Sequence, residues 1–241
     1  KIIIFGKDIL LENFLIKNKI YATSHFGFTG VNSKIRSYTW FPDFQEINLP
    51  DNFSFKSRLL RFVNLKLAIK HSTNILISSE SVLDDLKKIN KNYLKKTILI
   101  KHAIRLPKIK SFSQSKKILK KYNLNKKYFF LPNHLWKHKN HIVVLQALNY
   151  LKSEINFEII ATGFFNDHRN KNYSDYIKSY IKKNNLNKYI RHLGIIPFEE
   201  MIQIMLQSIA VINPSKSEGW SNTVEQAKSL GKKVVLSNIP T

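Results

Sequence analysis

The stretch PSKSEGWSNTVEQAKSLGKKVVLSNIP, residues 214–240, has the pattern of a loop, then a helix, then a strand. The loop opens with Pro214, directly after the apolar run IAVIN at 209–213. The helix is expected to begin near Asn222–Thr223 and to stop before Gly231, since glycine often follows the last turn of a helix. A strand that ends in a loop leading to a helix is the basic unit of an α/β fold.

The first turn of this helix is a candidate anion site. Free backbone N–H groups at residues Asn222, Thr223 and Val224 attract an anion, with about 0.3–1 kcal/mol from the helix dipole. Glu218 precedes this turn and would repel a phosphate in direct contact, so we expect its carboxylate to accept hydrogen bonds from hydroxyl groups such as those of a sugar. A solvated loop glutamate fits the spacing equally well. For Glu225 we expect a structural role, as the partner of Asn222 in a variant of the capping box.

A second loop at the end of an apolar run has the sequence LPNHLWKHKNH, residues 131–141. Its histidines suggest a metal site, but Lys137 and Lys139 lie among them, and no carboxylate or thiolate is near in the sequence. Because these cations oppose a bound dication, we expect no metal. Lys139 is instead a candidate phosphate ligand, as a charge-assisted donor worth about 1.5–3 kcal/mol. An exposed lysine in a lysine-rich chain is the other interpretation.

Short apolar runs alternate with helical patterns along the whole chain, which predicts an α/β fold with parallel sheets. Strands are expected at 1–5, 20–24, 36–41, 74–78, 97–101, 127–131, 156–161, 190–193, 209–213 and 233–237. Helices are expected at 9–17, 56–71, 81–90, 114–122, 140–152, 173–184, 198–207 and 223–230.

The segment RLPKIKSFSQSKK, residues 105–117, lacks a clear period and is predicted to be a linker. We therefore expect two domains, residues 1–110 and 111–241. Two open α/β units would leave a cleft between them, with ligands bound at the carboxyl ends of the strands.

Composition narrows the possible functions. The chain has 241 residues, 43% of them hydrophobic, and no cysteine, which excludes disulfides and thiol chemistry. Its net charge of +24 favours anionic partners such as nucleotides or acidic lipid headgroups. No apolar run reaches the roughly 18 residues of a membrane span, and no signal peptide is visible. The chain begins at Lys1 within an apolar run and stops at Thr241, and we expect further sequence beyond both ends.

Two features of the first half have alternative interpretations. Asp43 follows the run RSYTWF and a proline, where a carboxylate could accept a proton or orient a hydroxyl, or simply form a turn. The helix at 55–70 carries apolar and basic residues, typical of a membrane-surface helix or of a packed helix with a solvated basic face. We expect the packed helix. Ser81 followed by Asp84 predicts the cap of the next helix.

Taken together, these segments resemble glycosyltransferase family 4, whose members are retaining enzymes of the GT-B fold with two Rossmann-like domains facing a cleft. The segment NPSKSEGWSNTVEQAKSLGKKVVLSNIP is similar to the donor-binding segment of the family, and LPNHLWKHKNH is similar to the first loop of its C-terminal domain. FPDFQEINLPDNFS, with LAIKHSTNILISSESVLDDL, resembles the second half of its N-terminal domain. The resemblance implies an acceptor-side domain at 1–110 and a donor-nucleotide domain at 111–241, both incomplete.

The resemblance also implies roles for single residues. Glu218 would face the hydroxyls of the donor sugar, and it is the catalytic candidate together with Asp43. The residues implied to bind the nucleotide diphosphate or its sugar are Lys139, His134, Asn133, Gly163, Ser221, Asn222, Thr223, Val224 and Gln226. Ile195–Pro197 would help to shape the nucleoside pocket.

The chain departs from the family pattern at several positions. Gln226 stands where the family has a second glutamate, so its bond to a ribose hydroxyl would lack charge assistance. His134 replaces a basic residue and is positive only when protonated. In the N-terminal domain the chain has Pro42–Asp43 where the family often has His-Asp.

The sequence therefore predicts a retaining glycosyltransferase of the hexosyltransferase type, without cofactor or essential metal. It would move a sugar from a nucleotide-diphosphate donor to a glycan or lipid-linked acceptor, in bacterial surface polysaccharide synthesis. We expect it in the cytoplasm, at the inner face of the cell membrane if it binds anionic lipid, and without a nucleic-acid partner. A nucleotide-sugar epimerase of the same fold and a non-catalytic nucleotide-sugar-binding relative are the alternatives.

Overall fold

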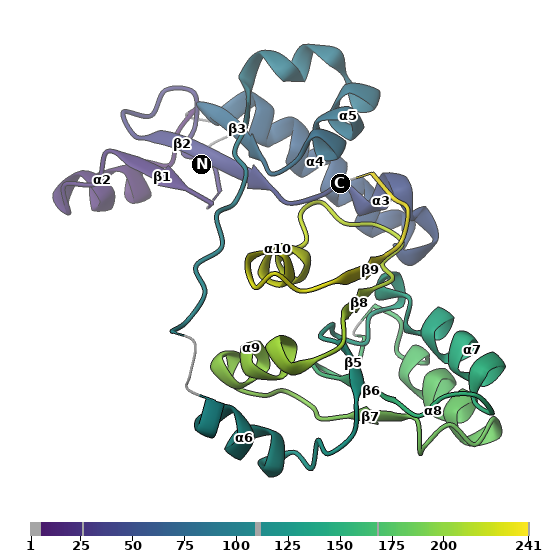
Figure 1. The fold of residues 1–241 in the computed structure, drawn as a ribbon. Coiled ribbons are helices and arrows are strands. Elements are labelled where there is room, and N and C mark those ends of the chain that lie inside the picture. Colours follow the sequence, from purple (N-terminus) through teal and green to yellow (C-terminus); the bar gives the residue numbers. More distant parts are fainter. Residues whose placement is uncertain (1–5, 26, 109–111, 168, 241) are drawn as a thin grey trace. The chain divides into compact units, whose positions relative to one another are not determined.

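The computed structural model describes residues 6–25, 27–108, 112–167 and 169–240. By their internal contacts the residues form two compact units. The first unit comprises Lys1–His102 with Glu218–Trp220 and Pro240–Thr241, and the second comprises Ala103–Ser217 with Ser221–Ile239. Each unit has its own parallel sheet (Figure 1), which confirms the predicted α/β fold with two parallel sheets.

The second unit is built on a five-stranded sheet with the strand order β7-β6-β5-β8-β9. All of its paired strands run parallel. In chain order the strands are β5 (Tyr128–Leu131), β6 (Glu158–Ala161), β7 (Ile190–His192), β8 (Val211–Asn213) and β9 (Val234–Leu236).

The strand order of this sheet reverses between β5 and β8. The chain adds β6 and β7 on one side of β5 and then crosses over to place β8 on the other side. Such a reversal is a topological switch point, where open α/β sheets bind ligands beyond the carboxyl ends of the strands. The loops that follow β5 and β8 are the two loops singled out from the sequence.

Helices cover both faces of this sheet (Figure 1). On one side lie α7 (His141–Leu151) and α8 (Tyr173–Lys183), and on the other lie α6 (Phe112–Lys121), α9 (Phe198–Gln207) and α10 (Asn222–Ser229). Successive strand residues point to opposite faces. Phe130 therefore packs toward α9, and its neighbour Leu131 packs toward α7. Burying a side chain of this size stabilises the fold by about 1.5–3 kcal/mol.

Half of the predicted linker is helical, which corrects the interpretation of residues 105–117. Helix α6 begins at Phe112. Its inner face carries Ser115, Ile118 and the partly buried Leu119, spaced as on one side of a helix. The Ser115 hydroxyl donates a hydrogen bond of 2.7 Å to Oε1 of Gln203 on α9. The helix predicted at 114–122 is therefore present but begins two residues earlier, so the predicted linker is helical from residue 112 on.

The first unit contains a four-stranded parallel sheet in the order β1-β2-β3-β4. Its elements are α2 (Ile9–Lys17), β1 (Ala22–Ser24), β2 (Arg36–Phe41), α3 (Gln45–Asn48), η1 (Pro50–Asn52), α4 (Phe55–His71), β3 (Asn74–Ile77), α5 (Glu80–Ile89), η2 (Lys91–Lys96) and β4 (Thr97–Leu99). Phe44, Leu65, Ile75 and Leu86 lie in its core. The predicted strand at 1–5 lies outside the described residues.

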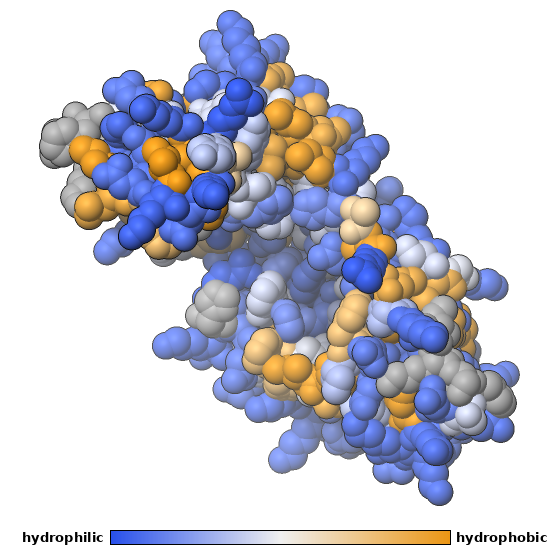
Figure 2. Space-filling view, turned by 90° about the vertical axis from the view of Figure 1, so that its left-hand side faces the viewer, coloured by the Kyte–Doolittle hydropathy of each residue, from blue (hydrophilic) through white to orange (hydrophobic). Residues whose placement is uncertain are grey.

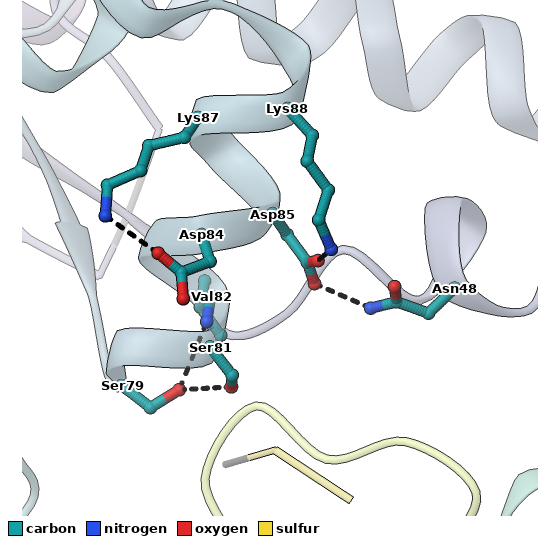
Figure 3. A network of polar contacts seen from close by, with 8 residues as sticks. All are labelled: Asn48, Ser79, Ser81, Val82, Asp84, Asp85, Lys87 and Lys88. Carbon is teal, nitrogen blue, oxygen red and sulfur yellow. Dashed lines mark hydrogen bonds and ion pairs between the residues drawn. The ribbon is translucent and has the colours of Figure 1, made fainter.

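Helix α5 is capped two residues earlier than the sequence predicts. Ser79, and not Ser81, is the N-cap: its Oγ accepts a hydrogen bond of 3.3 Å from the N–H of Val82 (Figure 3). Asp84, the other half of the predicted cap, instead pairs with Lys87 at 2.7 Å. The helix starts earlier because β3 ends at Ile77 and Ser79 already has the extended backbone of a cap.

Helix α4 buries less of its apolar surface than predicted. Leu65 and Ala68 are buried, but Leu59, Leu60, Phe62 and Val63, all expected on a packed face, are exposed. The first half of the helix therefore extends beyond the core of its unit. Figure 2 shows that hydrophilic side chains dominate the visible surface and that hydrophobic ones form smaller patches. Among the described residues, no helix is both long and apolar enough to pass through a bilayer.

Candidate functional site

The carboxyl ends of β5 and β8 are joined by one buried side chain, Asn213, the last residue of β8. Its Oδ1 accepts hydrogen bonds from Nδ2 of Asn133 at 3.1 Å and from the hydroxyl of Ser215 at 2.9 Å. Its Nδ2 donates to Oγ of Ser221 at 2.9 Å. Asn213 thus connects the loop after β5, the loop after β8 and Ser221, the N-cap residue of α10.

A second link between the two loops is made by the backbone. The N–H of Lys216 donates a hydrogen bond of 2.8 Å to the carbonyl oxygen of His138. The loops after the two central strands are therefore held together at the switch point, and the candidate residues Asn133 and Ser221 share one partner.

The first turn of α10 is open. Ser221 is the N-cap residue, but its side chain makes no capping bond to the helix. Within the described part of the chain, the N–H groups of Asn222, Thr223 and Val224 have no acceptor, since the first helical bond runs from the N–H of Glu225 to the carbonyl oxygen of Ser221. These N–H groups are what an anion site at a helix N-terminus requires.

The predicted capping box at this helix is wrong. The carboxylate of Glu225 pairs with Lys228 at 2.8 Å, one turn further along α10. The helix begins at Asn222, so Ser221 and not Asn222 is at the cap position, and Glu225 is one residue too late to reach back to the cap. At its other end the helix behaves as expected, because Gly231 follows the C-cap residue with φ of 65°.

Lys139 ends a short 3-10 helix, η3 (Lys137–Lys139), in the loop after β5. The next residue, Asn140, has the left-handed backbone conformation, with φ of 56° and ψ of 38°, and leads into α7. The ammonium group of Lys139 lies close enough to His134 and His138 to lower the pKa of both rings. Lys139 therefore brings positive charge to the same loop that carries Asn133.

His134 is held in a neutral form. The N–H of Phe164 donates a hydrogen bond of 2.9 Å to its Nδ1, so this nitrogen carries no proton. Burial and, to a lesser extent, the charge of Lys139 lower the pKa of His134. The imidazole therefore does not supply the positive charge of the basic residue it replaces in the family pattern.

Gly163 allows the loop after β6 to approach the loop after β5. Its φ of 116° is a conformation that residues with a side chain rarely adopt. A Cβ atom at this position would lie 2.8 Å from Nδ1 of His134 and 3.0 Å from the carbonyl carbon of Asn133. Three candidate residues, Asn133, His134 and Gly163, thus lie together.

An ion pair between Asp167 and Arg169, with 3.7 Å from Oδ1 to Nε, supports η3, and no local pattern in the sequence indicates it. The carboxylate of Asp167 accepts hydrogen bonds from the N–H of Lys137 at 2.9 Å and of Arg169 at 3.0 Å. Burial raises the pKa of Asp167, but these bonds and the charge of Arg169 outweigh it, so the pKa is lowered. Arg169 also donates to Nδ1 of His138 at 3.0 Å.

Two histidines of this loop, His134 and His138, have hydrogen-bond partners within the protein. His138 is buried, and burial, aided by the charges of Lys139 and Arg169, lowers its pKa to about 3. Across residues 6–25, 27–108, 112–167 and 169–240, no group of three or more histidines and acidic residues has a metal-binding arrangement. That the protein works without metal stays a prediction.

The remaining candidates lie further apart in the chain. Glu218 lies in the loop between β8 and α10 and is grouped with the first unit, and Gln226 is half-buried in the second turn of α10. Asp43 follows β2. One of its oxygens accepts from the N–H of Gln45 at 3.4 Å and the other from Nε2 of Gln45 at 2.9 Å. These bonds match the turn interpretation of Asp43, and a role in catalysis stays a prediction.

The fold is that of the GT-B glycosyltransferases. HepE from Anabaena, solved with UDP and glucose, aligns with a TM-score of 0.72 at 18% identity, over 86% of this chain and 54% of that one. A glycosyltransferase from Rickettsia africae aligns with a TM-score of 0.69 at 18% identity, over 96% of this chain and 61% of that one. WaaG, a glycosyltransferase involved in lipopolysaccharide biosynthesis, aligns with a TM-score of 0.70 at 14% identity, over 95% of this chain and 63% of WaaG. The chain therefore spans 54–63% of the length of these neighbours.

A family model assigns the chain more closely. The model described as glycosyl transferases group 1 matches residues 113–241, which are 129 of the 241 residues. The chain belongs to the group 1 glycosyltransferase family. The match includes the loops after β5 and β8 and the start of α10. A search of curated proteins finds no relative by sequence.

Proposed function

We propose that the protein is a retaining glycosyltransferase of family 4. It transfers a hexose from a nucleotide-diphosphate donor to a glycan or lipid-linked acceptor in the synthesis of bacterial surface polysaccharide. The bond between the anomeric carbon and the β-phosphate oxygen breaks as the bond to the acceptor oxygen forms. The negative charge that develops on the leaving diphosphate is the charge that the protein must stabilise.

The arrangement at the switch point of the second unit carries this proposal. Lys139 and the open N–H groups of Thr223 and Val224 come from the loops after β5 and β8, which Asn213 and the bond from Lys216 to His138 hold together. One ammonium group and several peptide donors can bind a diphosphate without a metal ion. In this proposal the domain that binds the donor is residues 111–241, and residues 1–110 bind the acceptor.

The other candidate residues have roles around the diphosphate. Glu218 accepts hydrogen bonds from sugar hydroxyls, and Gln226 accepts one from the ribose. Gly163 allows the donor to approach the backbone beside Asn133 and His134. Asp43 orients the acceptor hydroxyl and is the candidate to take up its proton.

The donor is tested first by thermal shift of the full chain with UDP-, GDP- and ADP-sugars, followed by transfer of the labelled sugar from the best of them. Lys139→Ala is expected to lower kcat/KM about 10- to 100-fold, because it removes a charge-assisted bond to the leaving group. Glu218→Ala is expected to act mainly on the sugar, lowering transfer while UDP, GDP or ADP alone still binds.

Lys137→Ala is the matched control, since Lys137 lies two residues before Lys139 on the same 3-10 helix and its side chain is exposed. Equal losses in the two lysine variants would show that general positive charge, and not Lys139, matters. Product analysis separates the alternatives: an epimerase returns an altered nucleotide-sugar, and a non-catalytic relative binds the donor without consuming it.

We propose in addition that α4 brings the first unit to an anionic membrane surface, at the inner face of the cell membrane. Phe55 is 79% exposed and Leu60 is 59% exposed, although both are large and apolar. The exposed cations Lys56, Arg58 and Lys66 lie on the same helix. Exposed aromatic and aliphatic side chains beside lysine and arginine are typical of helices that lie in the membrane interface.

This second part is tested by sedimentation with lipid vesicles. Binding is expected with vesicles that contain phosphatidylglycerol and to be much weaker with phosphatidylcholine alone or at high salt. Phe55→Ser with Leu59→Ser should weaken it further, whereas Tyr150→Ser, which removes an 85% exposed aromatic side chain from α7, should not. Equal binding to neutral vesicles, or an equal effect of the control, would refute a role for α4.

A further inference from the structure

Ser221, at the start of α10, behaves differently from the two N-cap serines described in the first unit. Ser54 and Ser79 each accept a hydrogen bond from their own helix, from the N–H of Ser57 at 3.2 Å and of Val82 at 3.3 Å. Ser221 has the same extended backbone, with φ of −94° and ψ of 97°, yet it makes no such bond. Its Oγ is instead the acceptor for Nδ2 of Asn213.

Asn213 has little freedom to do anything else. It is 4% exposed, and its Oδ1 is fixed by the amide of Asn133 and the hydroxyl of Ser215. With Oδ1 fixed on one side, the Nδ2 donor points toward Ser221, and a buried amide N–H that lost this acceptor would be costly. The geometry of Asn213 therefore fixes where the Ser221 hydroxyl lies.

From this geometry we infer that Asn213 is a positioning residue for the donor. It draws the Ser221 hydroxyl away from the first turn of α10 and so keeps the N–H groups of Thr223 and Val224 available to the diphosphate. The inference rests on the proposed function, because it assigns these N–H groups to the diphosphate. Asn213 itself touches neither substrate.

Removal of Asn213 has a defined consequence. A released serine at an N-cap accepts a hydrogen bond from the second or third N–H of its helix. Ser221 would then take one of the donors that the diphosphate needs, and the diphosphate would have to displace it. The loss of affinity would then require the Ser221 hydroxyl. A loss caused by a general loosening of the loop would occur with or without that hydroxyl.

The experiment measures binding of inorganic pyrophosphate, UDP, GDP and ADP to the full chain by calorimetry. Pyrophosphate reports on the phosphate site without sugar or base. Asn213→Ala is expected to weaken its binding about five- to tenfold, which corresponds to a capping bond of roughly 1 kcal/mol. Adding Ser221→Ala to Asn213→Ala is expected to recover most of the loss. Ser215→Ala removes a different bond to Asn213 and should change binding less than about twofold.

Each outcome decides between the possibilities. Unchanged binding in Asn213→Ala, or a double variant no better than Asn213→Ala alone, refutes the inference while leaving the proposed function intact. If the wild-type chain binds none of the four ligands, the proposed phosphate site is itself wrong, and the inference falls with it. If circular dichroism shows that Asn213→Ala does not fold, Asn213→Ser, which keeps a short polar group for Asn133, takes its place with the same expected rescue.

Discussion

The two units use polar side chains differently where helices begin. In the first unit, α2, α4 and α5 are each closed by the side chain of their own cap residue, Asp8, Ser54 or Ser79. In the second unit, α7, α8, α9 and α10 have no such bond among the described residues. These three helices of the first unit therefore satisfy one of their free N–H groups with their own cap side chain, whereas the first N–H groups of α10 stay open beside the switch point.

The comparison shows that residue type alone does not decide the role of a cap. Ser79 and Ser221 have the same side chain, and both lie at helix starts that follow a strand. The neighbouring strand makes the difference. At α10, β8 supplies Asn213 as a donor to Ser221, whereas Ser79 bonds within its own segment, to the hydroxyl of Ser81 and the N–H of Val82 (Figure 3). The cap side chain therefore bonds to its own helix at α5, but to a residue of the neighbouring strand at α10.

We expect the largest difference between the two units in how acid affects their free energies of unfolding. Burial lowers the pKa of His138 and His141 to about 3 and of His192 to about 4, all in the second unit. These rings titrate near pH 6.5 in the unfolded chain. Between these values the unfolded chain binds more protons, so the free energy of unfolding falls as the pH falls below about 6.5.

By pH 5 we expect each of these histidines to lower the free energy of unfolding of the second unit by about 2 kcal/mol. Hydrogen exchange read by mass spectrometry follows the two units separately. Protection in the second unit should fall well before that in the first, where His71 is the one buried histidine with a lowered pKa among the described residues. Equal loss in both units would contradict the assignment of neutral histidines to the second.

Gly163→Ala is expected to have the next largest effect. The added Cβ meets His134 and Asn133, and the φ of 116° is strained for alanine, so the second unit should lose about 2–4 kcal/mol. Urea unfolding of the second unit measures the loss. Gly194→Ala is the matched control, since it also has positive φ, of 75°, but a Cβ there meets no atom within 4 Å of the described structure. A similar loss in both variants would mean that backbone strain, and not the close approach, dominates.

Ser79→Ala should have the smallest effect on stability, and that effect should be confined to the first unit. It removes the cap of α5 and should lower the free energy of unfolding of the first unit by about 1 kcal/mol. Binding of UDP, GDP, ADP and pyrophosphate should not change, because this helix start is closed in the native protein. Weaker nucleotide binding in this variant would show that the two units do not divide their roles as proposed.

Much of the fold could be predicted from the sequence, because the periodicity of apolar residues and the residue types at the ends of strands are local signals. The helices at 9–17 and 198–207 and the strand at 36–41 have the predicted bounds. The failures depend on distant partners. The hydrogen bond that ties α6 to α9, from Ser115 to Gln203 88 positions away, has no local signal in the sequence. The exposed half of α4 could not be predicted, because periodicity does not say how far a helix extends past its sheet.

The positions of the candidate site residues at strand ends could be predicted, but their connections could not. The sequence indicated loops after two strands, whereas the pairing of β5 with β8 depends on the order of the whole sheet. Asn213, the residue that joins the loops, had one local signal: a polar residue that ends the apolar run IAVIN. Asp167 and Arg169 had none, since their contacts reach η3 about 30 positions earlier.

The hydrogen bond from Phe164 to His134 has an electrostatic consequence for the whole site. The hydrogen bond accepted at Nδ1 and the lowered pKa both favour the neutral form of this ring. Near neutral pH, the positive charge of the loop after β5 therefore comes from Lys137 and Lys139 and not from His134.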